Sequence, residues 1–340
     1  MTAFTSISHQ IWDMKYRFKS EGGTPIDQTI PDTLCRVATA LAEPEQDSEF
    51  WKEKFYKALT DFCFLPAGRI VSGAGTERNV TLFNCFVMGN IPDDMSGIFL
   101  ALKEAALTMQ QGGGIGYNFS TLRPKGSRVN GVGADASGPL SFMDVWDSMC
   151  RTIMSAGSRR GAMMAVMRCD HPDIEGFIEA KREPGRLRMF NLSVLVTDDF
   201  MTAVKEDTAW NLSFDKTVYK SLPARELWDK IMRANYAFAE PGVIFIDRIN
   251  RLNPLNYCET IHGTNPCGEQ PLPPYGACLL GSINLARLIK NPFSEKARID
   301  EKELTLLVTT AVRMLDNTID VSQFPLAAQQ TEAQAKRRIG

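Results

Sequence analysis

Residues 264–285 read TNPCGEQPLPPYGACLLGSINL. The stretch opens with an amide, a thiol and a carboxylate at alternate positions, Asn265, Cys267 and Glu269. Proline and glycine separate these residues and restrict the backbone, so the sequence predicts a tight loop with the thiol at its tip. A second thiol, Cys278, opens an apolar run that predicts a buried strand. The loop therefore combines a reactive sulfur with a hydrogen-bonding group and a proton acceptor.

Composition and charge are those of an ordinary globular chain. The 340 residues are 44% hydrophobic and 23% charged, enough for one large domain or two smaller ones. A net charge of −2 gives no general attraction to nucleic acid or anionic membranes, and no apolar run is long enough to span a membrane. Eight scattered cysteines without a CxxC pair indicate a reducing, cytoplasmic setting.

Helical and strand patterns alternate along the chain. The first 62 residues favour helices, and an extended segment is expected from Pro66. Strands are predicted over residues 82–88, 163–167, 190–196 and 243–246. Further helices are predicted from Ser96 to the glycines at 112–114, from Pro139, after Thr197, through 227–238 and over 300–320. Strands separated by helices imply crossover connections and an α/β architecture.

The loop and three other stretches carry a family resemblance. Asn265-Pro266-Cys267-Gly268-Glu269, followed by Cys278 in GACLLGSINL, resembles the active-site loop and following strand of the large ribonucleotide reductases. FNCFVMGNIPDD, MQQGGGIGYNFSTLRPKG and SAGSRRGAMMAVMRCDHPDIEGFI resemble the adenosylcobalamin-dependent (class II) branch. The resemblance runs from about Ile7 to the last residue and covers the first part of a family member.

The resemblance implies an architecture for the whole chain. Residues 1–62 are expected to form an N-terminal helical region. Residues 63–340 are expected to form the first half of a ten-stranded α/β barrel that includes the loop. The barrel is expected to be incomplete, as in a truncated or split polypeptide that needs its C-terminal half.

The resemblance also implies roles for the three loop residues in the reduction of ribonucleotides to 2′-deoxyribonucleotides. Cys267 would carry a thiyl radical that takes the 3′ hydrogen from the sugar, with adenosylcobalamin as the source of the radical. Glu269 would accept the proton of the 3′ hydroxyl inside a closed barrel that shields it from water. Asn265 would hold the sugar hydroxyls and the carboxylate in place.

A redox dithiol and the substrate contacts follow from the same resemblance. Cys85 and Cys278 would lie on adjacent barrel strands and would form a disulfide bond with each other. Such a bond requires their Cα atoms to lie within about 7 Å. A thioredoxin-type reductant would reopen the disulfide. Asn84, Cys85 and Gly114 would line the substrate site.

An effector site is the last feature that the resemblance implies. A deoxynucleoside triphosphate or ATP would bind at the interface of a homodimer as an allosteric effector. Asp93 and Arg123 would contact this effector. Arg160 would lie in the loop that relays the identity of the effector to the substrate site, and planar guanidinium groups suit phosphates and base edges.

Four alternative interpretations remain open. Cys267 could be a structural cysteine in a proline-rich connection. Cys258, His262 and Cys267 could ligate zinc, but they lack CxxC or HxxxH spacing, so no metal site is predicted. The chain could instead be a catalytically inactive module for effector binding and dimerisation. It could also belong to a metal-radical (class I) reductase that uses a separate radical-bearing subunit.

Overall fold

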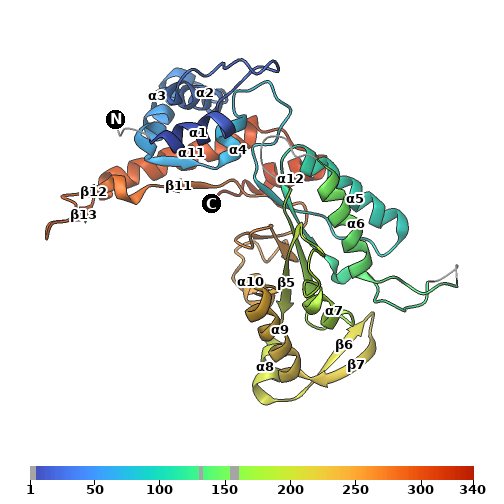
Figure 1. Ribbon diagram of the computed structural model, residues 1–340. Helices are drawn as coiled ribbons and strands as arrows, with labels where there is room; N and C mark the ends of the chain where they lie inside the picture. The colour runs from blue at the N-terminus through green and yellow to red at the C-terminus, as the bar shows by residue number, and fades with distance from the viewer. Residues whose placement is uncertain (1–4, 130–132, 154–160) are drawn as a thin grey trace.

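The computed structural model describes residues 5–129, 133–153 and 161–340, and Figure 1 shows a helical region joined to a sheet region. The helical region contains α1 (Ser6–Lys15), α2 (Ile30–Ala42), α3 (Ser48–Leu59) and α11 (Glu301–Val321). α11 comes from the far end of the chain and packs against α2 and α3 (Figure 1). The predicted N-terminal helical region is confirmed, and a later helix joins it.

Local sequence explains where α2 begins and how it is held. The Thr29 hydroxyl accepts a hydrogen bond from the Asp32 amide, and the Asp32 carboxylate accepts one from the Thr29 amide, which forms a capping box. Val37 and Leu41 lie on the fully buried face of the helix. Asn317 of α11 donates to the Leu41 carbonyl at 2.9 Å, so a polar contact fixes the position of α11 as well.

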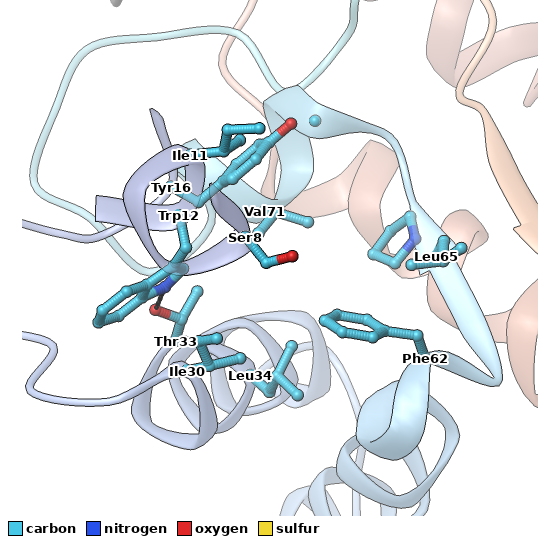
Figure 2. Close-up of a pocket in the computed structure, with 12 residues that line it drawn as sticks. Ser8, Ile11, Trp12, Tyr16, Ile30, Thr33, Leu34, Phe62, Leu65 and Val71 are labelled. Atoms are coloured by element: carbon cyan, nitrogen blue, oxygen red, sulfur yellow. Dashed lines mark hydrogen bonds between the residues drawn. The ribbon is translucent and has the colours of Figure 1, made fainter. Parts of the chain in front are cut away.

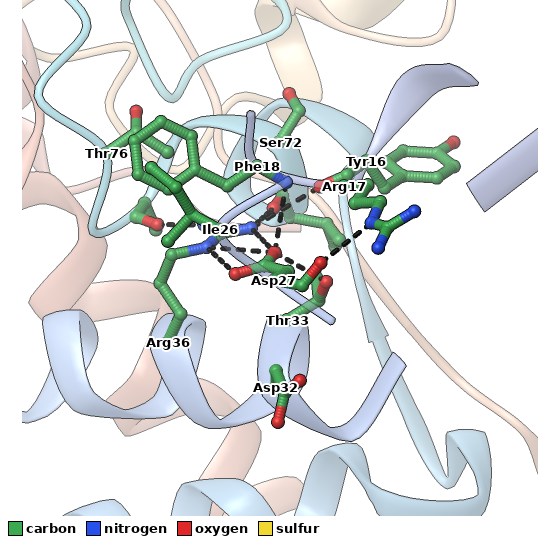
Figure 3. Close-up of polar contacts among 12 residues, drawn as sticks. Tyr16, Arg17, Phe18, Ile26, Asp27, Asp32, Thr33, Arg36, Ser72 and Thr76 are labelled. Atoms are coloured by element: carbon green, nitrogen blue, oxygen red, sulfur yellow. Dashed lines mark hydrogen bonds and ion pairs between the residues drawn. The ribbon is translucent and has the colours of Figure 1, made fainter. Parts of the chain in front are cut away.

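A buried ion pair joins α2 to the segment between α1 and α2 (Figure 3). The side chain of Asp27 is 3% exposed and lies 3.0 Å from the Arg36 guanidinium. It also accepts hydrogen bonds from Thr33 Oγ1 (2.6 Å) and the Phe18 amide (3.1 Å). Burial acts to raise the pKa of Asp27, and the hydrogen bonds from Arg36, Thr33 and Phe18 outweigh it, so the pKa of this carboxyl lies below its usual range.

Arg36→Gln is expected to destabilise the fold by roughly 3 kcal/mol, because it leaves the Asp27 carboxylate buried without its cation. The pKa of Asp27 is lowered in the folded state. The stability from this pair is therefore present above the ordinary aspartate range and is lost as the pH falls through the lowered pKa. Urea denaturation at neutral and acidic pH measures both effects.

The matched control is Lys52→Gln, which removes an ion pair with the exposed Glu49 and is expected to change stability by less than about 1 kcal/mol. Equal losses for Arg36→Gln and Lys52→Gln would contradict the prediction.

The second region is built on a five-stranded parallel sheet with the strand order β2-β3-β4-β5-β8. The strands are β2 (Cys85–Val87), β3 (Gly114–Asn118), β4 (Met163–Arg168), β5 (Phe190–Val196) and β8 (Gly242–Phe245). The helices between them are α5 (Met95–Gln110), α6 (Pro139–Thr152), α7 (Ile174–Glu179), α8 (Asp198–Glu206) and α9 (Ala224–Phe238). Parallel strands require such crossovers, so the α/β prediction is confirmed.

Alternation along the strands gives the sheet two different faces. Tyr117 of β3 and Trp146 of α6 pack edge-on with ring centroids 5.8 Å apart, and Phe119 packs against Trp146 at 5.7 Å. Met164 and Val166 of β4 point to the other face, where a smaller apolar cluster forms. The five crossover helices therefore cover one face, and other parts of the chain, including Ile246 and Ile249, pack on the second face.

The remaining elements are short. They are β1 (Phe64–Pro66), β6 (Ala209–Phe214), β7 (Thr217–Pro223), β9 (Gly263–Thr264), β10 (Pro271–Leu272), β11 (Gly281–Ile283), β12 (Ile289–Lys290), β13 (Arg298–Ile299), α4 (Gly68–Gly73), α10 (Ile246–Leu252), α12 (Ala327–Lys336), η1 (Thr60–Phe62), η2 (Phe119–Thr121) and η3 (Leu285–Leu288). β1 pairs with β11 and ties the two regions together. Among the residues that the structure describes, the five parallel strands do not close into a barrel, as expected for an incomplete one.

Two extended segments differ from the sequence predictions. The segment predicted from Pro66 is wrong, because α4 follows at once and buries Ile70 completely. The strand predicted from Cys278 begins only at β11. Ala277 pairs antiparallel with β2, whereas Leu279 pairs in parallel with the chain near its end, so no continuous ladder forms between them.

Three other boundaries also differ. Gly114, predicted to stop a helix, is the first residue of β3, because the glycine run hides a strand that lacks apolar alternation. Asp94 caps α5 by accepting from the Gly97 amide at 2.9 Å, and Ser96 lies inside the helix. β8 is a half-buried edge strand and not a buried one, because it has a strand neighbour only on its β5 side.

Candidate active site

A short hairpin lies on the face of the sheet opposite the crossover helices, the face on which α10 also packs. β9 and β10 pair antiparallel, and residues 265–270 connect them; we call residues 263–272 the finger loop. β9 contacts β2, β3 and β4. The finger loop therefore crosses the first three strands of the sheet.

Gly116 permits the close approach of the finger loop. An added Cβ at Gly116 would lie 1.8 Å from the Thr264 carbonyl oxygen, so no other residue fits without movement of the backbone. On the other side of the contact, an added Cβ at Gly263 would lie 3.7 Å from the Val87 and Val166 methyl groups, an ordinary distance. A single glycine in β3 thus determines how deeply the finger loop lies against the sheet.

Asn265 holds the turn that presents the thiol. Its side-chain oxygen accepts hydrogen bonds from the Gln270 amide (2.9 Å) and from Thr264 Oγ1 (3.2 Å). Its carbonyl accepts from the Gly268 amide at 3.0 Å, and Gly268 has a φ of 81°, which favours glycine. Asn265, which the resemblance assigns to the substrate sugar, is fully buried. Its hydrogen bonds also hold the loop in shape.

The thiol and the carboxylate of the loop lie in the open. Cys267 and Glu269 are both exposed at the tip of the finger loop. The expectation that Glu269 is shielded from water is wrong for the part of the chain that the structure describes. The described strands do not close into a barrel, and residues 267–269 at the tip are exposed.

Strand register brings the other two thiols together. Phe86 pairs antiparallel with Ala277, and the Val87 amide donates to the Gly276 carbonyl at 2.8 Å. The next pair in this register is Cys85 and Cys278. Directly opposed residues of antiparallel chains have Cα atoms about 4.5–5.5 Å apart, within the range that a disulfide spans. Both side chains are buried.

Contacts at Gly114 link this thiol pair to the finger loop. An added Cβ at Gly114 would lie 3.0 Å from Pro266 Cγ and 3.2 Å from Cys85 Sγ. The Gly114 amide donates to the Asn84 carbonyl at 2.8 Å. Asn191 of β5 donates to the Pro266 carbonyl at 2.7 Å and anchors the loop from the neighbouring strand. The structure therefore brings Asn84 and Cys85 together at Gly114, which in turn lies beside Pro266 of the finger loop.

Several buried polar atoms at this place have no hydrogen-bond partner within the described residues. They are Asn84 Oδ1, Asn265 Nδ2, Gln270 Oε1 and Gln270 Nε2. Each such group costs about 1–3 kcal/mol if it stays unsatisfied, so their grouping marks a site that suits a polar ligand. The sequence analysis missed Gln270 and Asn191. Gln270 directly follows the loop motif, but nothing local marks Asn191.

The pKa of Cys278 lies above that of an ordinary thiol. Burial raises the pKa of Cys278 to about 11. The positive charge of Arg338 opposes this rise in pKa, and the Glu269 carboxylate adds to it. Cys278 is therefore a protonated thiol at neutral pH, a hydrogen and electron donor and not a resident nucleophile.

The predicted effector residues are found in a different place. Arg123 Nε lies 2.8 Å from the Asp93 carboxylate, and Arg123 Nη2 donates to the Asp93 carbonyl at 3.0 Å. The pair therefore fixes one loop against another without any ligand. Arg160 lies outside the residues that the structure describes.

The pocket in the helical region has a mainly apolar lining (Figure 2). It has a volume of about 370 Å³ and is lined mainly by apolar and aromatic side chains, including Trp12, Leu34, Phe62 and Leu65. None of the predicted site residues lines it.

A metal centre or a membrane-spanning helix would be a further feature of the described ranges. No group of three or more histidine, cysteine, aspartate or glutamate side chains is placed to hold a metal ion there. Cys258, a candidate zinc ligand, instead accepts a hydrogen bond from Lys336 Nζ at 3.2 Å. No described helix has the length and apolar character to cross a bilayer.

Comparison with known proteins identifies the family. Residues 2–79 match the all-alpha domain of ribonucleotide reductases, and residues 83–340 match their barrel domain. The vitamin B12-dependent ribonucleoside-diphosphate reductase of Mycobacterium tuberculosis (strain CDC 1551 / Oshkosh) is 41% identical over 333 residues, which cover 96% of this chain and 47% of the relative.

Two further relatives extend the comparison. The enzyme of the same name from Thermoplasma acidophilum is 40% identical over 84% of this chain and 37% of its own. The ribonucleoside-diphosphate reductase subunit alpha of Chlamydia muridarum is 26% identical over 90% of this chain and 32% of its own. The chain spans about half the length, or less, of these relatives. By both family matches, the chain belongs to the ribonucleotide reductase family.

Proposed function

We propose that this chain carries the radical-bearing loop and the redox dithiol of a vitamin B12-dependent reductase that converts ribonucleoside diphosphates to 2′-deoxyribonucleotides for DNA synthesis. One observation supports the proposal: the finger loop that holds Cys267 lies against β2 and β3, and Phe86 of β2 pairs with Ala277, so that Cys85 and Cys278 each adjoin this pair. The names of the relatives at 40–41% identity support the substrate and the cofactor.

The chemistry can be assigned to side chains in balanced steps. Cys267, as a thiyl radical, takes the 3′ hydrogen of the ribonucleotide, and Glu269 accepts the proton of the 3′ hydroxyl. The 2′ hydroxyl takes one proton of the Cys85–Cys278 dithiol and leaves as water, and Glu269 later returns its proton to the 3′ oxygen. Cys85 and Cys278 supply two electrons and two protons in all as they form a disulfide bond. Cys267 then returns its hydrogen to the 3′ carbon. A thioredoxin-type dithiol then reduces the disulfide in the cytoplasm.

Adenosylcobalamin, when bound, supplies the radical that this chemistry needs. The residue that must receive the radical is Cys267. Its exposure at the tip of the finger loop fits this role, because a large cofactor can reach the sulfur without movement of the sheet. The M. tuberculosis and T. acidophilum relatives are named as B12-dependent, which favours this source over a separate radical-bearing subunit.

We also propose that the chain forms a homodimer with a nucleotide effector site. Met95, Phe99 and Leu100 form an exposed apolar patch on α5, and such a patch favours a protein contact. The loops joined by Asp93 and Arg123 adjoin α5. An effector would contact this pair together with Arg160 and would carry its signal to the substrate site.

A single-turnover experiment tests the proposed function. The chain is combined with a polypeptide that supplies the second half of a B12-dependent relative, adenosylcobalamin and a ribonucleoside diphosphate, without reductant. We expect no more than one deoxyribonucleotide per chain, together with a Cys85–Cys278 disulfide detected by mass spectrometry of unreduced peptides. Cys150 and Cys169, which are buried elsewhere, serve as internal controls and are expected to stay reduced.

Two outcomes would count against the proposal. Product without the Cys85–Cys278 disulfide would remove the redox dithiol from the mechanism. Nucleotide binding in calorimetry without product, whatever second half is supplied, would favour an effector-binding and dimerisation module.

A further inference from the structure

A charged cluster lies behind the Cys278 thiol, in residues that the proposed mechanism does not use. The Arg338 side chain is 16% exposed and contacts two carboxylates, Glu259 and Glu332, with Glu332 Oε1 2.5 Å from Nη1. Lys336 Nζ lies 3.8 Å from the Glu259 carboxylate. Asn253 Nδ2 donates to Glu259 at 2.9 Å. Burial opposes the charge of Arg338, but its two carboxylate partners outweigh it and raise the pKa, so Arg338 stays charged.

The backbone at Arg338 lies directly beside the thiol. The Leu279 amide donates to the Arg338 carbonyl at 3.2 Å, and the Gly340 amide donates to the Leu279 carbonyl at 2.7 Å. The Gly281 amide donates to the Gly340 carbonyl at 3.0 Å. An added Cβ at Gly340 would lie 3.4 Å from Cys278 Sγ, so residues 338–340 form one wall of the thiol site.

The contacts of Arg338 therefore cross three parts of the chain. Glu259 precedes the finger loop, Glu332 lies on α12, and the backbone of Arg338 pairs with the strand segment that follows Cys278. A guanidinium whose two terminal nitrogens contact two different carboxylates has few alternative positions. Its release would loosen the wall beside Cys278 and remove the positive charge that acts on that thiol.

We propose that Arg338 is a positioning residue for the Cys278 thiol: held between Glu259 and Glu332, it keeps residues 338–340 against the strand of the thiol and keeps a positive charge beside the sulfur. The inference deepens the proposed function, on which it rests, because it assigns control of the redox dithiol to a third group. The charged groups that act on Cys278 are Arg338 and Glu269, and the opposing residue is Cys85.

The test measures alkylation of Cys278 by iodoacetamide in the full chain over a range of alkaline pH, with peptide mass spectrometry as the readout. Arg338→Gln removes the positive charge, so the thiolate becomes less stable and the midpoint of the pH profile moves up. At a fixed pH below the midpoint, we expect the alkylation rate, divided by the high-pH plateau rate of the same variant, to fall about threefold. Arg338→Lys keeps the positive charge, so its midpoint is expected to lie close to that of the parent chain.

Two further variants keep the test decisive if Arg338→Gln folds poorly. Glu332→Gln removes one of the two carboxylates, so the net charge beside Cys278 becomes more positive and the midpoint is expected to move down. Arg337→Gln is the matched control. This adjacent arginine pairs with Asp316 and Asp320 of α11 and is expected to leave the midpoint unchanged.

The movement of the midpoint of the pH profile separates a positioning role of Arg338 from a merely structural one. If Arg338 only packs the site, its loss opens the thiol to the reagent and speeds alkylation at every pH without moving the midpoint. That result, or equal shifts in Arg337→Gln and Arg338→Gln, would overturn the inference. Alkylation needs neither ribonucleotide nor cobalamin, so its outcome is independent of the turnover experiment on the proposed function.

Discussion

Cys267→Ser is expected to reduce deoxyribonucleotide formation to background, a loss of more than about a thousandfold. A serine O–H bond is much stronger than a thiol S–H bond, so the hydroxyl can neither receive the radical nor take the 3′ hydrogen and return it. The side chain lies exposed at the tip of the finger loop, where the change removes no buried contact. The measurement is turnover of the chain combined with the second half of a B12-dependent relative.

The control for this variant is Cys35→Ser, which replaces another exposed thiol, on α2, and is expected to keep full turnover. The thermal midpoints of both variants are expected to match that of the parent chain, because neither thiol is packed. Turnover that survives Cys267→Ser would rule out the thiyl-radical role of this residue.

Gly116→Ala is expected to displace the finger loop. The added methyl group would lie 1.8 Å from the Thr264 carbonyl oxygen, which is backbone and cannot rotate away. The loop must therefore move by an ångström or more, and a misplacement of about 1 Å at a reacting group costs on the order of a hundredfold in rate. Stability is expected to fall by about 3 kcal/mol, at the upper end for an overpacked contact.

The matched control for Gly116→Ala is Gly263→Ala, on the opposite side of the same contact. An added methyl group there would lie at 3.7 Å from its nearest neighbours, so turnover and the free energy of unfolding are expected to change little. Urea denaturation and turnover measure both variants. Parent-like turnover in Gly116→Ala would show that the close approach of the loop is not needed.

Local patterns predicted several elements well. The strand over residues 190–196 and the helix after Asp300 were predicted to within a residue or so, because apolar periodicity and a capping side chain both lie within the segment itself. β3 was missed because its glycines were selected for closeness to the finger loop and not for strand propensity. The β6–β7 hairpin was missed because most of its side chains are exposed and carry little apolar signal.

The candidate site also combines features that local sequence marks with features that depend on packing between distant segments. Proline and glycine restrict the backbone wherever the segment lies, so the sequence was enough to predict one tight loop with Asn265, Cys267 and Glu269. The anchoring of this loop by Asn191 and the effect of Arg338 on Cys278 emerge only in the folded chain. Such neighbours depend on strand order and register, which arise from packing between segments far apart in the chain and leave no local pattern in it.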